Sequence, residues 1–469
     1  MDGLNCNEIQ YSELFPNNTI FRLDAEFFSR EAITIDKKIK EISCFYLKPQ
    51  EVVSGPFGSS LKSESYLEQG DVPFVRIENI RGGFDINMDN IIYISNADNA
   101  RIKNSQLSIN DIVLSKVGNS IGFFARVDES IGLCNISENN IGIKLSTYSE
   151  EEKHYILTYL NSFYAQKLVL RRTSGNAQPK LNVGDLCYIP IPSFSDNFYK
   201  NISLLVVNSR KLNLKSKQIY CDTEKQLMVV LKIDDLNNKH ENINIKSLVE
   251  SFGCGGRLDA EYYQPIYENI EKQIDSTNTI IASCENRDEN FTPNENEFYQ
   301  YIELANVDSM GGISTVDKIQ GKELPSRARR LVKTGQVIIS SVEGSLQSCA
   351  LITEEFNNAV CSTGFYVIDS EKYNSETLLV LFKSEPVQAL LKKRCSGTIL
   401  TAISKEEFEK MPLPEVDEIA QNAIKEKVQE SFRLRKKSKE LLDTAIKAVE
   451  MAIETDEQTA LAWLGTQNV

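Results

Sequence analysis

The sequence is short of the residues that most metal centres and nucleophilic enzymes use. His154 and His240 are its only histidines, and its ten cysteines are never closer together than twelve positions. Without a Cys-x-x-Cys pair a structural zinc site is not expected. Two histidines also offer little basis for a histidine-rich metal centre or for a Ser-His or Cys-His nucleophile. Scattered cysteines in so long a chain are typical of reduced core residues, which favours a cytoplasmic protein.

The sequence also lacks membrane, export and cofactor signals. Its longest apolar runs, at 202–207 and 377–382, fall far short of the roughly 20 residues that span a bilayer. The first five residues show no charged-then-apolar export pattern. It contains no Asp-Pro-Pro-Tyr or Asn-Pro-Pro-Tyr methyltransferase motif, no Gly-x-Gly-x-x-Gly loop and no P-loop. We therefore expect a non-catalytic chain with no membrane segment, no metal and no cofactor.

The chain is acidic on average but not along its length. Its 469 residues carry 52 lysines and arginines against 66 acids, a formal net charge of −14, in an ordinary globular composition. That length predicts two or three domains, and that charge argues against a uniformly basic nucleic-acid binder. However, 165–181, 198–232 and 318–333 are basic, while 150–152, 283–303 and 450–457 are acidic. The basic segments can bind phosphate, while the acidic segments can face protein partners. The alternative is that all of these segments are ordinary solvent-exposed surface.

The chain contains one internal duplication, whose two halves we call the first and second copy. Arg22–Phe28 (RLDAEFF) returns as Arg257–Tyr263 (RLDAEYY), 235 positions later. Two further blocks follow in the same order: Ile112–Val127 matches Val337–Ile352 at an offset of 225, and Ser209–Gln218 matches Ser431–Glu440 at 222. An Ile-Pro-Ile-Pro run at 189–192 matches Met-Pro-Leu-Pro at 411–414. The shrinking offset indicates that the second copy has lost loop residues.

Each copy has the same predicted order of elements. A short helix follows the RLDAE block, then about 140 residues of β-rich sequence with an internal helix, then a long helix after the prolines. The expected short helices are 24–41 and 259–274, and the internal ones are 151–171 and 375–394. The expected strands are 74–77, 111–114, 141–145, 300–304, 337–341 and 365–368. The predicted class is therefore α+β, with two duplicated β-rich domains and a pair of long coiled-coil helices.

The long helices have one stripe of positions spaced alternately by four and three residues, which is the coiled-coil period. The stripe is apolar at its ends and polar in its middle in both copies, and polar seam positions fix register and partner. In the first copy it comprises Ile202, Val206, Ser209, Asn213, Ser216, Tyr220, Thr223, Leu227 and Val230. In the second copy it comprises Ile424, Val428, Ser431, Arg435, Ser438, Leu442, Ala445, Val449 and Ala452. We expect the helices to pack on each other, with Ser209, Asn213 and Ser216 facing Ser431, Arg435 and Ser438, and to hold the β-rich domains apart. Two independent surface helices, or a seam that meets a partner's helix, are the alternatives.

These elements give expected domain boundaries. They are an N-terminal segment and helix at 1–42, a first β-rich domain at 43–195 and a first spacer helix at 196–233. A linker with the second short helix follows at 234–282, then a second β-rich domain at 283–415, and a second spacer helix with a C-terminal tail at 416–469.

The ordered features resemble the specificity subunit of a type I restriction-modification system. They include the Val-Pro-Phe-Val-Arg-Ile-Glu-Asn-Ile strand at 72–80, the Gly-Asn-Ser-Ile-Gly turn at 118–122, the proline exits and one helical spacer in each copy. The resemblance implies two target recognition domains that each read half of an interrupted duplex DNA sequence. It also implies two adenine methyltransferase subunits and restriction or translocase subunits as partners, which carry the methyl-donor, nuclease and ATP sites. The second copy departs from the pattern with Glu-Gly-Ser-Leu-Gln at 343–347, and neither proline pair is followed by the family's Glu-Gln.

Residue types select the candidate DNA contacts. Glycines at 55–58 allow close approach to a polyanion, and hydroxyls and lysines offer donors to phosphate. Asparagine and glutamine can pair with adenine, and lysine or arginine with guanine. The candidates are Ser59, Ser60, Lys62, Lys116, Asn119, Arg171, Arg172, Asn176, Gln178, Lys180, Arg327, Arg329, Arg330, Ser345, Gln347, Arg394, Ser396 and Thr398. An ordinary turn at 55–62 and a helix-capping turn at 174–180 remain alternatives. The RLDAE blocks are expected to cap and brace helices instead.

Three functions from different classes remain open. The first is DNA-sequence recognition within a modification or restriction complex. The second is a non-catalytic scaffold whose paired domains bind protein, which the acidic average favours. The third is a nuclease within one β-rich domain, for which Asp111 and Lys116 are the nearest candidates.

Overall fold

The computed structural model describes residues 8–14, 22–58, 60–80, 82, 84–118, 120–175, 178–233, 243–252, 257–274, 277–287, 289–314, 316, 318–397 and 401–467. The chain forms two compact units. The first comprises residues 1–211 with 437–469, and the second comprises residues 212–436. Both long helices therefore contribute to both units. Within the described residues, none of the helices has a stretch apolar enough, over a sufficient length, to cross a bilayer.

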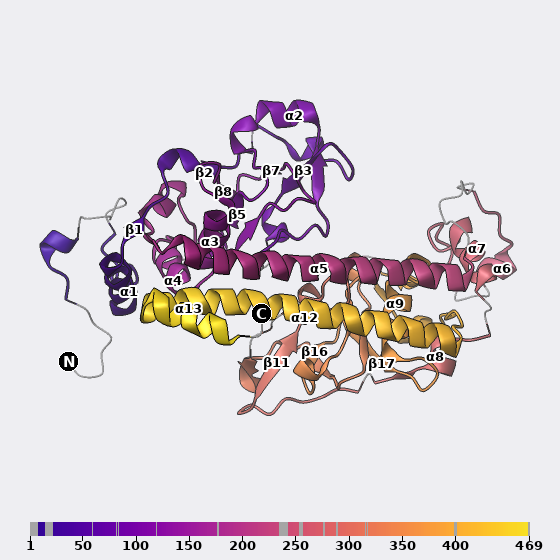
Figure 1. The fold of residues 1–469 in the computed structure, drawn as a ribbon. Helices are drawn as coiled ribbons and strands as arrows, with labels where there is room; N and C mark the ends of the chain where they lie inside the picture. The colour runs from indigo at the N-terminus through magenta and orange to yellow at the C-terminus, as the bar shows by residue number, and fades with distance from the viewer. Residues whose placement is uncertain are drawn as a thin grey trace. The chain divides into compact units, whose positions relative to one another are not determined.

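The first unit contains the β-rich part of the first copy (Figure 1). Its four-stranded sheet has the order β2-β8-β5-β6 and is antiparallel throughout, and a three-stranded sheet has the order β4-β3-β7 with β3 and β7 parallel. The strands are β2 (Val52–Ser54), β3 (Val72–Val75), β4 (Ile92–Ile94), β5 (Ile112–Ser115), β6 (Phe124–Arg126), β7 (Asn135–Ile136) and β8 (Asn140–Ile143). A further pair joins β1 (Cys44–Phe45) to β9 (Ile191–Pro192), and α2 (Asn96–Arg101) follows β4. Strand β5 is buried along its whole length, as its apolar sequence predicts.

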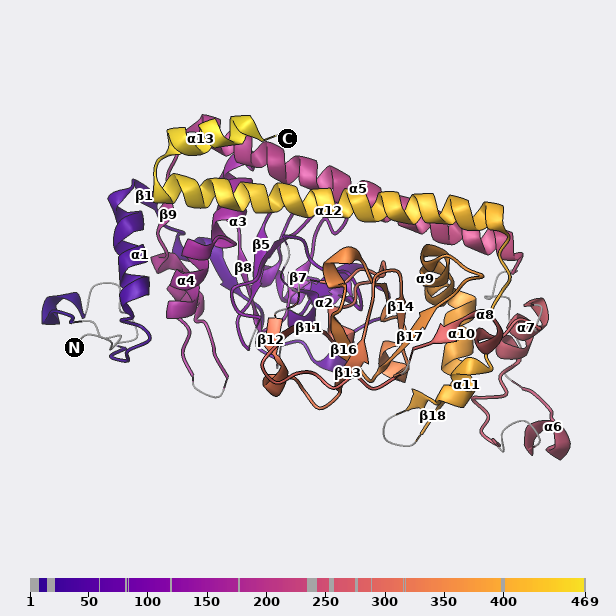
Figure 2. The ribbon, with the colours of Figure 1, turned by 90° about the horizontal axis from the view of Figure 1, so that it is seen from below.

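The second unit repeats this arrangement for the second copy, with α9 beside the sheet that contains β14 and β17 (Figure 2). Its sheets have the orders β10-β17-β14-β15 and β12-β11-β16-β13, and β11 and β16 are again the parallel pair. The strands are β10 (Glu285–Asn286), β11 (Phe298–Ile302), β12 (Lys318–Gln320), β13 (Ala328–Leu331), β14 (Val337–Ser340), β15 (Cys349–Leu351), β16 (Val360–Ser362) and β17 (Phe365–Asp369). A hairpin of β18 (Cys395–Ser396) and β19 (Ala402–Ile403) follows, and the short helices are α6 (Leu248–Phe252), α8 (Ile280–Ser283) and α11 (Lys405–Glu409). The α+β duplication predicted from the sequence is confirmed.

Each predicted internal helix is in fact two helices. The first is divided into α3 (Glu150–Leu160) and α4 (Phe163–Arg171), and the second into α9 (Ser375–Lys383) and α10 (Glu385–Arg394). The break lies at a serine N-cap in both copies, because Ser162 Oγ accepts from the Ala165 N–H at 3.4 Å and Ser384 precedes a first turn that contains Pro386. The prediction of one continuous helix at 151–171 and one at 375–394 was therefore wrong, because each helix is interrupted once.

The short helices begin later than the sequence pattern suggested. Helix α1 (Arg30–Glu41) starts after the N-cap Ser29, and α7 (Pro265–Gln273) starts with proline in its first turn. The expected strand at 74–77 is displaced by two residues, because β3 begins at Val72 and ends at Val75. A 3₁₀ turn follows there, in which the Asn79 side chain accepts from the Arg76 N–H at 2.9 Å.

The RLDAE block of each copy fastens the segment before the short helix to the end of the second internal helix. The Arg22 guanidinium donates to the carbonyls of Arg171, at 3.1 Å, and Thr173. The Arg257 guanidinium donates to the carbonyls of Lys393 and Cys395 at 3.3 and 3.0 Å. In both copies the next aspartate of the block holds the same guanidinium. These contacts are the bracing role predicted for the blocks.

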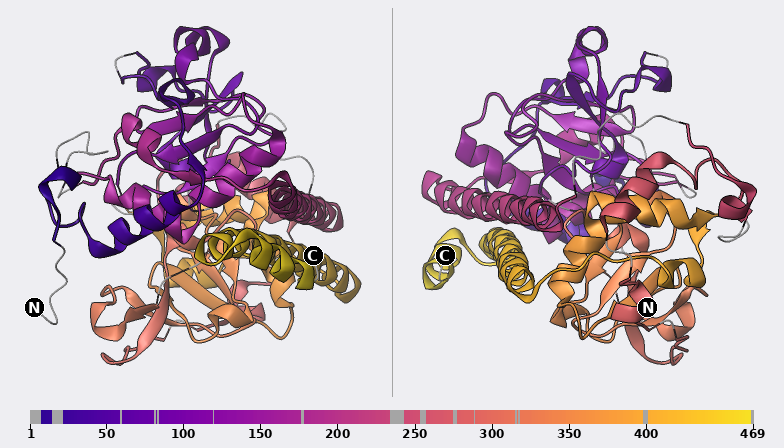
Figure 3. Two further views of the ribbon diagram at one scale, coloured as in Figure 1. Left: turned by 60° about the vertical axis from the view of Figure 1, so that its left-hand side comes forward. Right: turned by 90° about the vertical axis from the view of Figure 1, so that its right-hand side faces the viewer.

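The two long helices are α5 (Asp196–Leu231) and α12 (Glu418–Glu454). The predicted second helix is interrupted after Glu454, where Asp456 caps a separate helix α13 (Glu457–Thr466) that folds back beside α12 (Figure 2 and Figure 3) and places the Trp463 ring centre 5.2 Å from Lys447 Nζ. In the first unit Ser209 Oγ bonds Ser438 Oγ at 2.8 Å, and in the second unit Ser216 Oγ bonds Ser431 Oγ at 2.9 Å. The predicted seam and its serine pairs are confirmed, whereas Arg435, also expected in the seam, donates from Nη1 to the Asp308 carboxylate at 2.7 Å. The serine that comes earlier in α5 pairs with the serine that comes later in α12, so the two helices are antiparallel.

Candidate nucleic-acid interface

The first copy brings two of the predicted contact loops together. The turn that begins at Val117 pairs with the strand-like end of the 174–180 hairpin, because Val117 and Lys180 form an antiparallel bridge. The hairpin itself closes through two backbone hydrogen bonds between Ser174 and Lys180, at 2.9 and 2.8 Å. Gly118 N donates to the Pro179 carbonyl at 3.0 Å. Two segments more than 50 positions apart in the sequence therefore present one continuous surface.

That surface carries two lysines, Lys116 and Lys180. Lys116 Nζ donates to the Glu138 carbonyl at 2.8 Å, while Lys180 is exposed one bridge away. Burial, and then the positive charge of Lys180, lower the pKa of Lys116, which Glu138 partly offsets. The positive charges of the two lysines repel each other, and a bound anion would reduce that repulsion. The exposed side chain of Gln178, on the same hairpin, adds an amide group to this surface.

The glycine-rich loop at 55–62 joins the same surface through the turn at 137–140. Gly55 N donates to the Asn140 carbonyl at 3.2 Å, and Gly58 N donates to the Glu138 carboxylate at 2.6 Å. A Cβ at Gly55 would lie 1.8 Å from the Ser137 carbonyl oxygen, so only glycine fits there. Ser60 and Lys62 are exposed beyond this contact. Four predicted contacts, Ser59, Asn119, Asn176 and Thr398, lie outside the described residues.

The second copy keeps the backbone of this site but changes its side chains. Val342 bridges Ala402 as Val117 bridges Lys180, and Ser396 pairs with Ala402 as Ser174 pairs with Lys180. The Ile403 N–H donates to the Ser341 carbonyl at 2.8 Å, as Leu181 does to Lys116 at 2.9 Å. The positions of the two lysines are therefore occupied by Ser341 and Ala402. Of the predicted contacts here, Ser396 and Gln347 are exposed.

Ser345 has a role inside its own turn. Its hydroxyl bonds Ser340 Oγ at 3.1 Å and the Val342 carbonyl at 3.3 Å. The matching pair in the first copy is Ser120 with Ser115, at 3.0 Å. Because the Ser345 hydroxyl already makes hydrogen bonds within its own turn, it is a weaker candidate for contact with a ligand.

The arginines at the ends of the internal helices are also used within the fold. Arg171 Nε donates to the Phe27 carbonyl at 2.5 Å and its guanidinium lies 4.5 Å from the Phe27 ring centre. Arg172 is buried with Asp185 at 3.8 Å. In the second copy Arg394 is buried with Glu271 at 3.0 Å. Burial lowers the pKa of Arg171 and Arg172. These three guanidinium groups are therefore engaged within the fold, and the proposed interface does not include them.

The second copy carries its exposed positive charge elsewhere, along β13. The Arg327 side chain is 64% exposed and lies 3.5 Å from Glu303. Arg329 Nε donates to the Ser326 carbonyl at 3.0 Å, and Arg330 Nη1 donates to the Asn290 side chain at 3.0 Å. Arg329 and Arg330 lie in β13, an edge strand of the β12-β11-β16-β13 sheet, and Arg327 immediately precedes it, so the three arginines form the candidate phosphate-binding surface of this copy.

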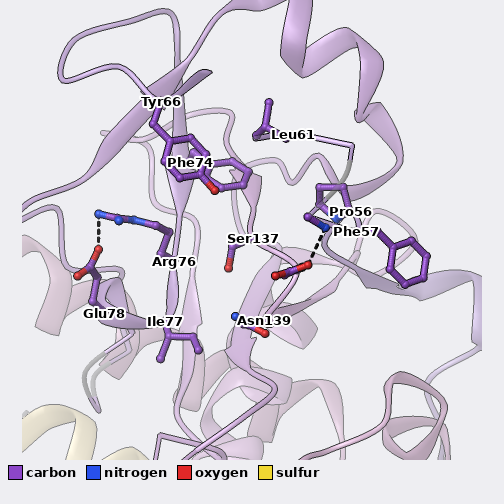
Figure 4. A pocket seen from close by; sticks show the side chains of 12 residues that line it. Pro56, Phe57, Leu61, Tyr66, Phe74, Arg76, Ile77, Glu78, Ser137 and Asn139 are labelled. Atoms are coloured by element: carbon purple, nitrogen blue, oxygen red, sulfur yellow. Dashed lines mark hydrogen bonds and ion pairs between the residues drawn. The ribbon is translucent and has the colours of Figure 1, made fainter. Parts of the chain in front are cut away.

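A cavity in the first copy was not predicted from the sequence. It has a volume of about 400 Å³ and lies beside the 137–140 turn, between the loop at 56–61 and the end of β3 (Figure 4). Tyr66 and Phe74 form one wall, with their ring centres 5.5 Å apart. Arg76 and Asn139 supply polar groups. The only signal in the sequence was the strand at 72–80, which ends in a charged pair, Arg76 and Glu78.

The described residues contain no group of three or more His, Cys, Asp or Glu side chains that could hold a metal ion. The nuclease candidates Asp111 and Lys116 do not meet. The Asp111 carboxylate accepts from the Leu145 and Ser108 N–H groups at 2.8 and 2.9 Å and so ties β5 to its neighbours, and burial raises its pKa.

No family model matches the sequence, and no curated protein matches it. Among solved structures, the chain is similar to the type I restriction-modification S subunit of M. genitalium, with 13% identity over 90% of this chain and 96% of the other, at a TM-score of 0.33. It is similar to the HsdS subunit of Thermoanaerobacter tengcongensis, with 12% identity over 89% and 96%, at a TM-score of 0.26. A chain from a structure of type I R-M complex assembly and conformational transition gives 12% identity over 92% and 97%, at 0.26.

Proposed function

We propose that this chain is a non-catalytic DNA-recognition subunit that reads a bipartite, interrupted duplex sequence. The observation that carries the proposal is the duplication itself: one backbone scaffold occurs twice, and each occurrence displays a different set of exposed donors. Two similar modules attached to paired helices suit a ligand with two half-sites, as duplex DNA offers. Modules that differ only in their exposed side chains suit half-sites of different sequence.

In the first copy, phosphate contacts position the domain and amide groups read bases. Lys116 and Lys180 take adjacent phosphates, since their mutual repulsion falls when an anion lies between them. Gln178 lies on the same hairpin and can pair with the N6 and N7 edge of adenine in the major groove. Ser60 and Lys62 extend the phosphate contacts along the glycine-rich loop.

In the second copy, the arginines in β13 and just before it take the place of the two lysines. Arg327, Arg329 and Arg330 can each engage phosphate, or guanine in a bidentate manner. Ser396 and Gln347 supply the exposed hydrogen-bonding groups near the second hairpin. Because the donors differ in type and in position on the fold, this domain reads a different half-site from the first.

The long helices connect the two reading domains. Helix α5 has 36 residues, which corresponds to about 54 Å at 1.5 Å per residue. We propose that the helix pair sets the separation of the half-sites and that it docks two adenine methyltransferase subunits, with restriction or translocase subunits joining through them. Chemistry on DNA then belongs to these partners, and this chain directs them to the target.

Coexpression with the methyltransferase subunit encoded beside it, followed by sequencing of adenine methylation across the host genome, tests this function. We expect one new methylated motif made of two short specified sequences that flank an unspecified spacer. An intact complex that produces no such motif would contradict the proposal and would favour the protein-binding scaffold that the net charge of −14 suggests.

A further inference from the structure

The cavity of the first copy is open where the second copy is filled. Val52 pairs with Ile143, and Asn286 pairs with Ile368, which lies 225 positions after Ile143. Phe57 and Phe291 each follow that paired residue by five positions, so they occupy corresponding places in the two copies.

The two phenylalanines behave differently. Phe291 is half-buried, with its ring centre 5.7 Å from that of Tyr299, and it packs on the apolar cluster around Tyr301 and Val360. Phe57 is 83% exposed, and Figure 4 shows its ring turned away from the Tyr66–Phe74 wall. The first copy thus leaves the half-buried Tyr66 ring, beside the buried Phe74, open to the cavity at a place where the second copy completes its core.

The cavity also contains an unused hydrogen-bond donor. Arg76 Nε is buried without a hydrogen-bond partner, while the end of the same guanidinium binds Glu78 and the Asn90 carbonyl. A buried donor without an acceptor is costly unless a ligand supplies one. The position that corresponds to Arg76 in the second copy is Glu303, whose N–H bonds Asn306 at 2.8 Å as that of Arg76 bonds Asn79 at 2.9 Å. The donor therefore belongs to the open cavity alone.

The cavity lies directly beside the proposed phosphate contacts. Lys116 donates to the carbonyl of Glu138, and Ser137, Glu138 and Asn139 all line the cavity. A group that enters the cavity is thus one turn away from the two lysines. Figure 4 shows the Asn139 carboxamide and the Ser137 hydroxyl on the side of the cavity facing the aromatic wall.

We propose that this cavity holds one nucleobase of the bound DNA outside the base stack. A flat aromatic ring stacks on Tyr66 beside the buried Phe74, its acceptor edge receives the Arg76 Nε–H, and Asn139 supplies the second polar contact. A volume of about 400 Å³ accommodates any one base with its sugar. The inference rests on the proposed DNA-binding function, and it assigns to the first copy a task that the second copy does not share.

Equilibrium binding of the full-length chain to two short duplexes of the same sequence tests the cavity. One duplex is fully paired, and the other carries a single unpaired thymine, which removes the cost of breaking a pair before the base leaves the stack. The wild-type chain is expected to bind the second duplex at least tenfold more tightly. Equal affinities would overturn the inference while leaving the DNA-binding function intact, whereas binding to neither duplex would overturn both.

Two variants separate occupation of the cavity from simple preference for bent DNA. Ile77→Trp fills the cavity, and it should remove the tenfold preference without changing affinity for the paired duplex. Arg76→Met keeps the side-chain length but removes the donor, and should reduce the preference to about threefold. The matched control is Leu304→Trp at the corresponding position of the second copy, which should keep the full preference. If Ile77→Trp and Arg76→Met, both folded by melting temperature, kept the preference as well, the cavity would not be the site.

Discussion

The two copies share their bracing contacts and differ in the side chains that they expose. Both retain the arginine brace, a serine–serine bond in the turn after the central strand, and a tyrosine that donates to the second proline of the exit. The last bond joins Tyr155 to Pro192 at 2.7 Å and Tyr373 to Pro414 at 2.9 Å. By contrast, the lysines of the first copy correspond to Ser341 and Ala402. This difference indicates that packing constrains the residues of the shared scaffold. The exposed residues can differ, so that each copy can bind a different ligand.

The first internal helix of each copy differs at one buried position. His154 in α3 corresponds to Glu376 in α9 at the offset of 222. His154 Nδ1 lies 2.8 Å from Ser203 Oγ on α5, and Glu376 accepts from the Gln429 side chain on α12 at 2.7 Å. Both residues attach the domain to a long helix, but through side chains of different chemistry.

This difference leads to the largest expected effect, a sensitivity of the first unit to acid. Burial, and next the charge of Arg126, lower the pKa of His154 to about 4 from 6.5. The unfolded chain therefore takes up a proton first, so stability falls as the pH drops from about 6.5 to about 4, by about 3 kcal/mol in all. Urea unfolding followed by the fluorescence of Trp463, the single tryptophan and part of this unit, measures the loss.

The matched variant for this measurement is His154→Asn, which keeps a polar atom near the Nδ1 position and cannot take up the proton. Its stability should change little between pH 6.5 and pH 4 beyond the slope contributed by the carboxylates. The same slope in the variant and the wild type would show that His154 is not the acid-sensitive group.

The next effect concerns the charge difference between the copies. Replacing Lys116 and Lys180 by alanine should weaken binding to duplex DNA roughly 100-fold at low salt, because two phosphate contacts and their released counterions are lost. The slope of log affinity against log salt should become shallower by about two. Fluorescence anisotropy titrations at several salt concentrations measure both quantities.

The corresponding change in the second copy, Ser341→Ala, serves as the control and should leave affinity and slope unchanged. An unaltered salt slope in the lysine variant would mean that the two lysines do not meet phosphates. The reverse outcome, a large effect of Ser341→Ala, would break the proposed division between the copies.

A smaller effect tests where the copies agree. Arg22→Ala and Arg257→Ala should each destabilise the chain by about 2 kcal/mol, since each leaves helix-end carbonyls without a charged donor. Chemical denaturation with hydrogen exchange at the ends of α4 and α10 locates the loss. The adjacent leucines are the control: Leu23 and Leu258 are 74% and 65% exposed, so their replacement by alanine should cost less than about 0.5 kcal/mol. Clearly unequal costs for the two arginines would contradict an equivalent brace.

The smallest effect is in the helix seam. Ser216 both donates to and accepts from Ser431, at 2.8 to 3.0 Å, whereas Ser209 makes one bond to Ser438. Ser216→Ala should cost about 1 kcal/mol and Ser209→Ala less, and alanine at both Ser209 and Ser438 should be nearly neutral because no hydroxyl is left unpaired. Denaturation midpoints at pH 7 measure these differences, and a larger cost for Ser209→Ala would reverse the assignment.

The sequence predicted the parts of the fold that repeat with a regular period. The four-three spacing placed Ser209, Ser216, Ser431 and Ser438 in the seam before any contact was known, because helix period alone decides which residues share a face. The apolar pattern did not predict the helix interruptions at Ser162 and Asp456, where one capping residue outweighs that pattern.

The side-chain roles were less predictable. Arg394 was expected to face DNA, yet its partner Glu271 lies 123 positions earlier in the chain, and no local pattern indicates such a contact. The cavity beside Arg76 was missed for the same reason, since it depends on a place that Phe57 leaves open. In contrast, Lys116 and Lys180 were selected by residue type, and the hairpin bridge brings them together.

The central claim is that each copy reads its own half of one DNA sequence. The most direct measurement uses the methylated motif found in the host genome, with duplexes in which the first half, the second half or neither is scrambled, titrated with the wild-type chain and with Lys116→Ala/Lys180→Ala. We predict that scrambling either half weakens wild-type binding. In the variant, one particular half should lose most of its effect while the other keeps it. Equal sensitivity of the variant to both halves, or indifference of the wild type to one of them, would contradict the account.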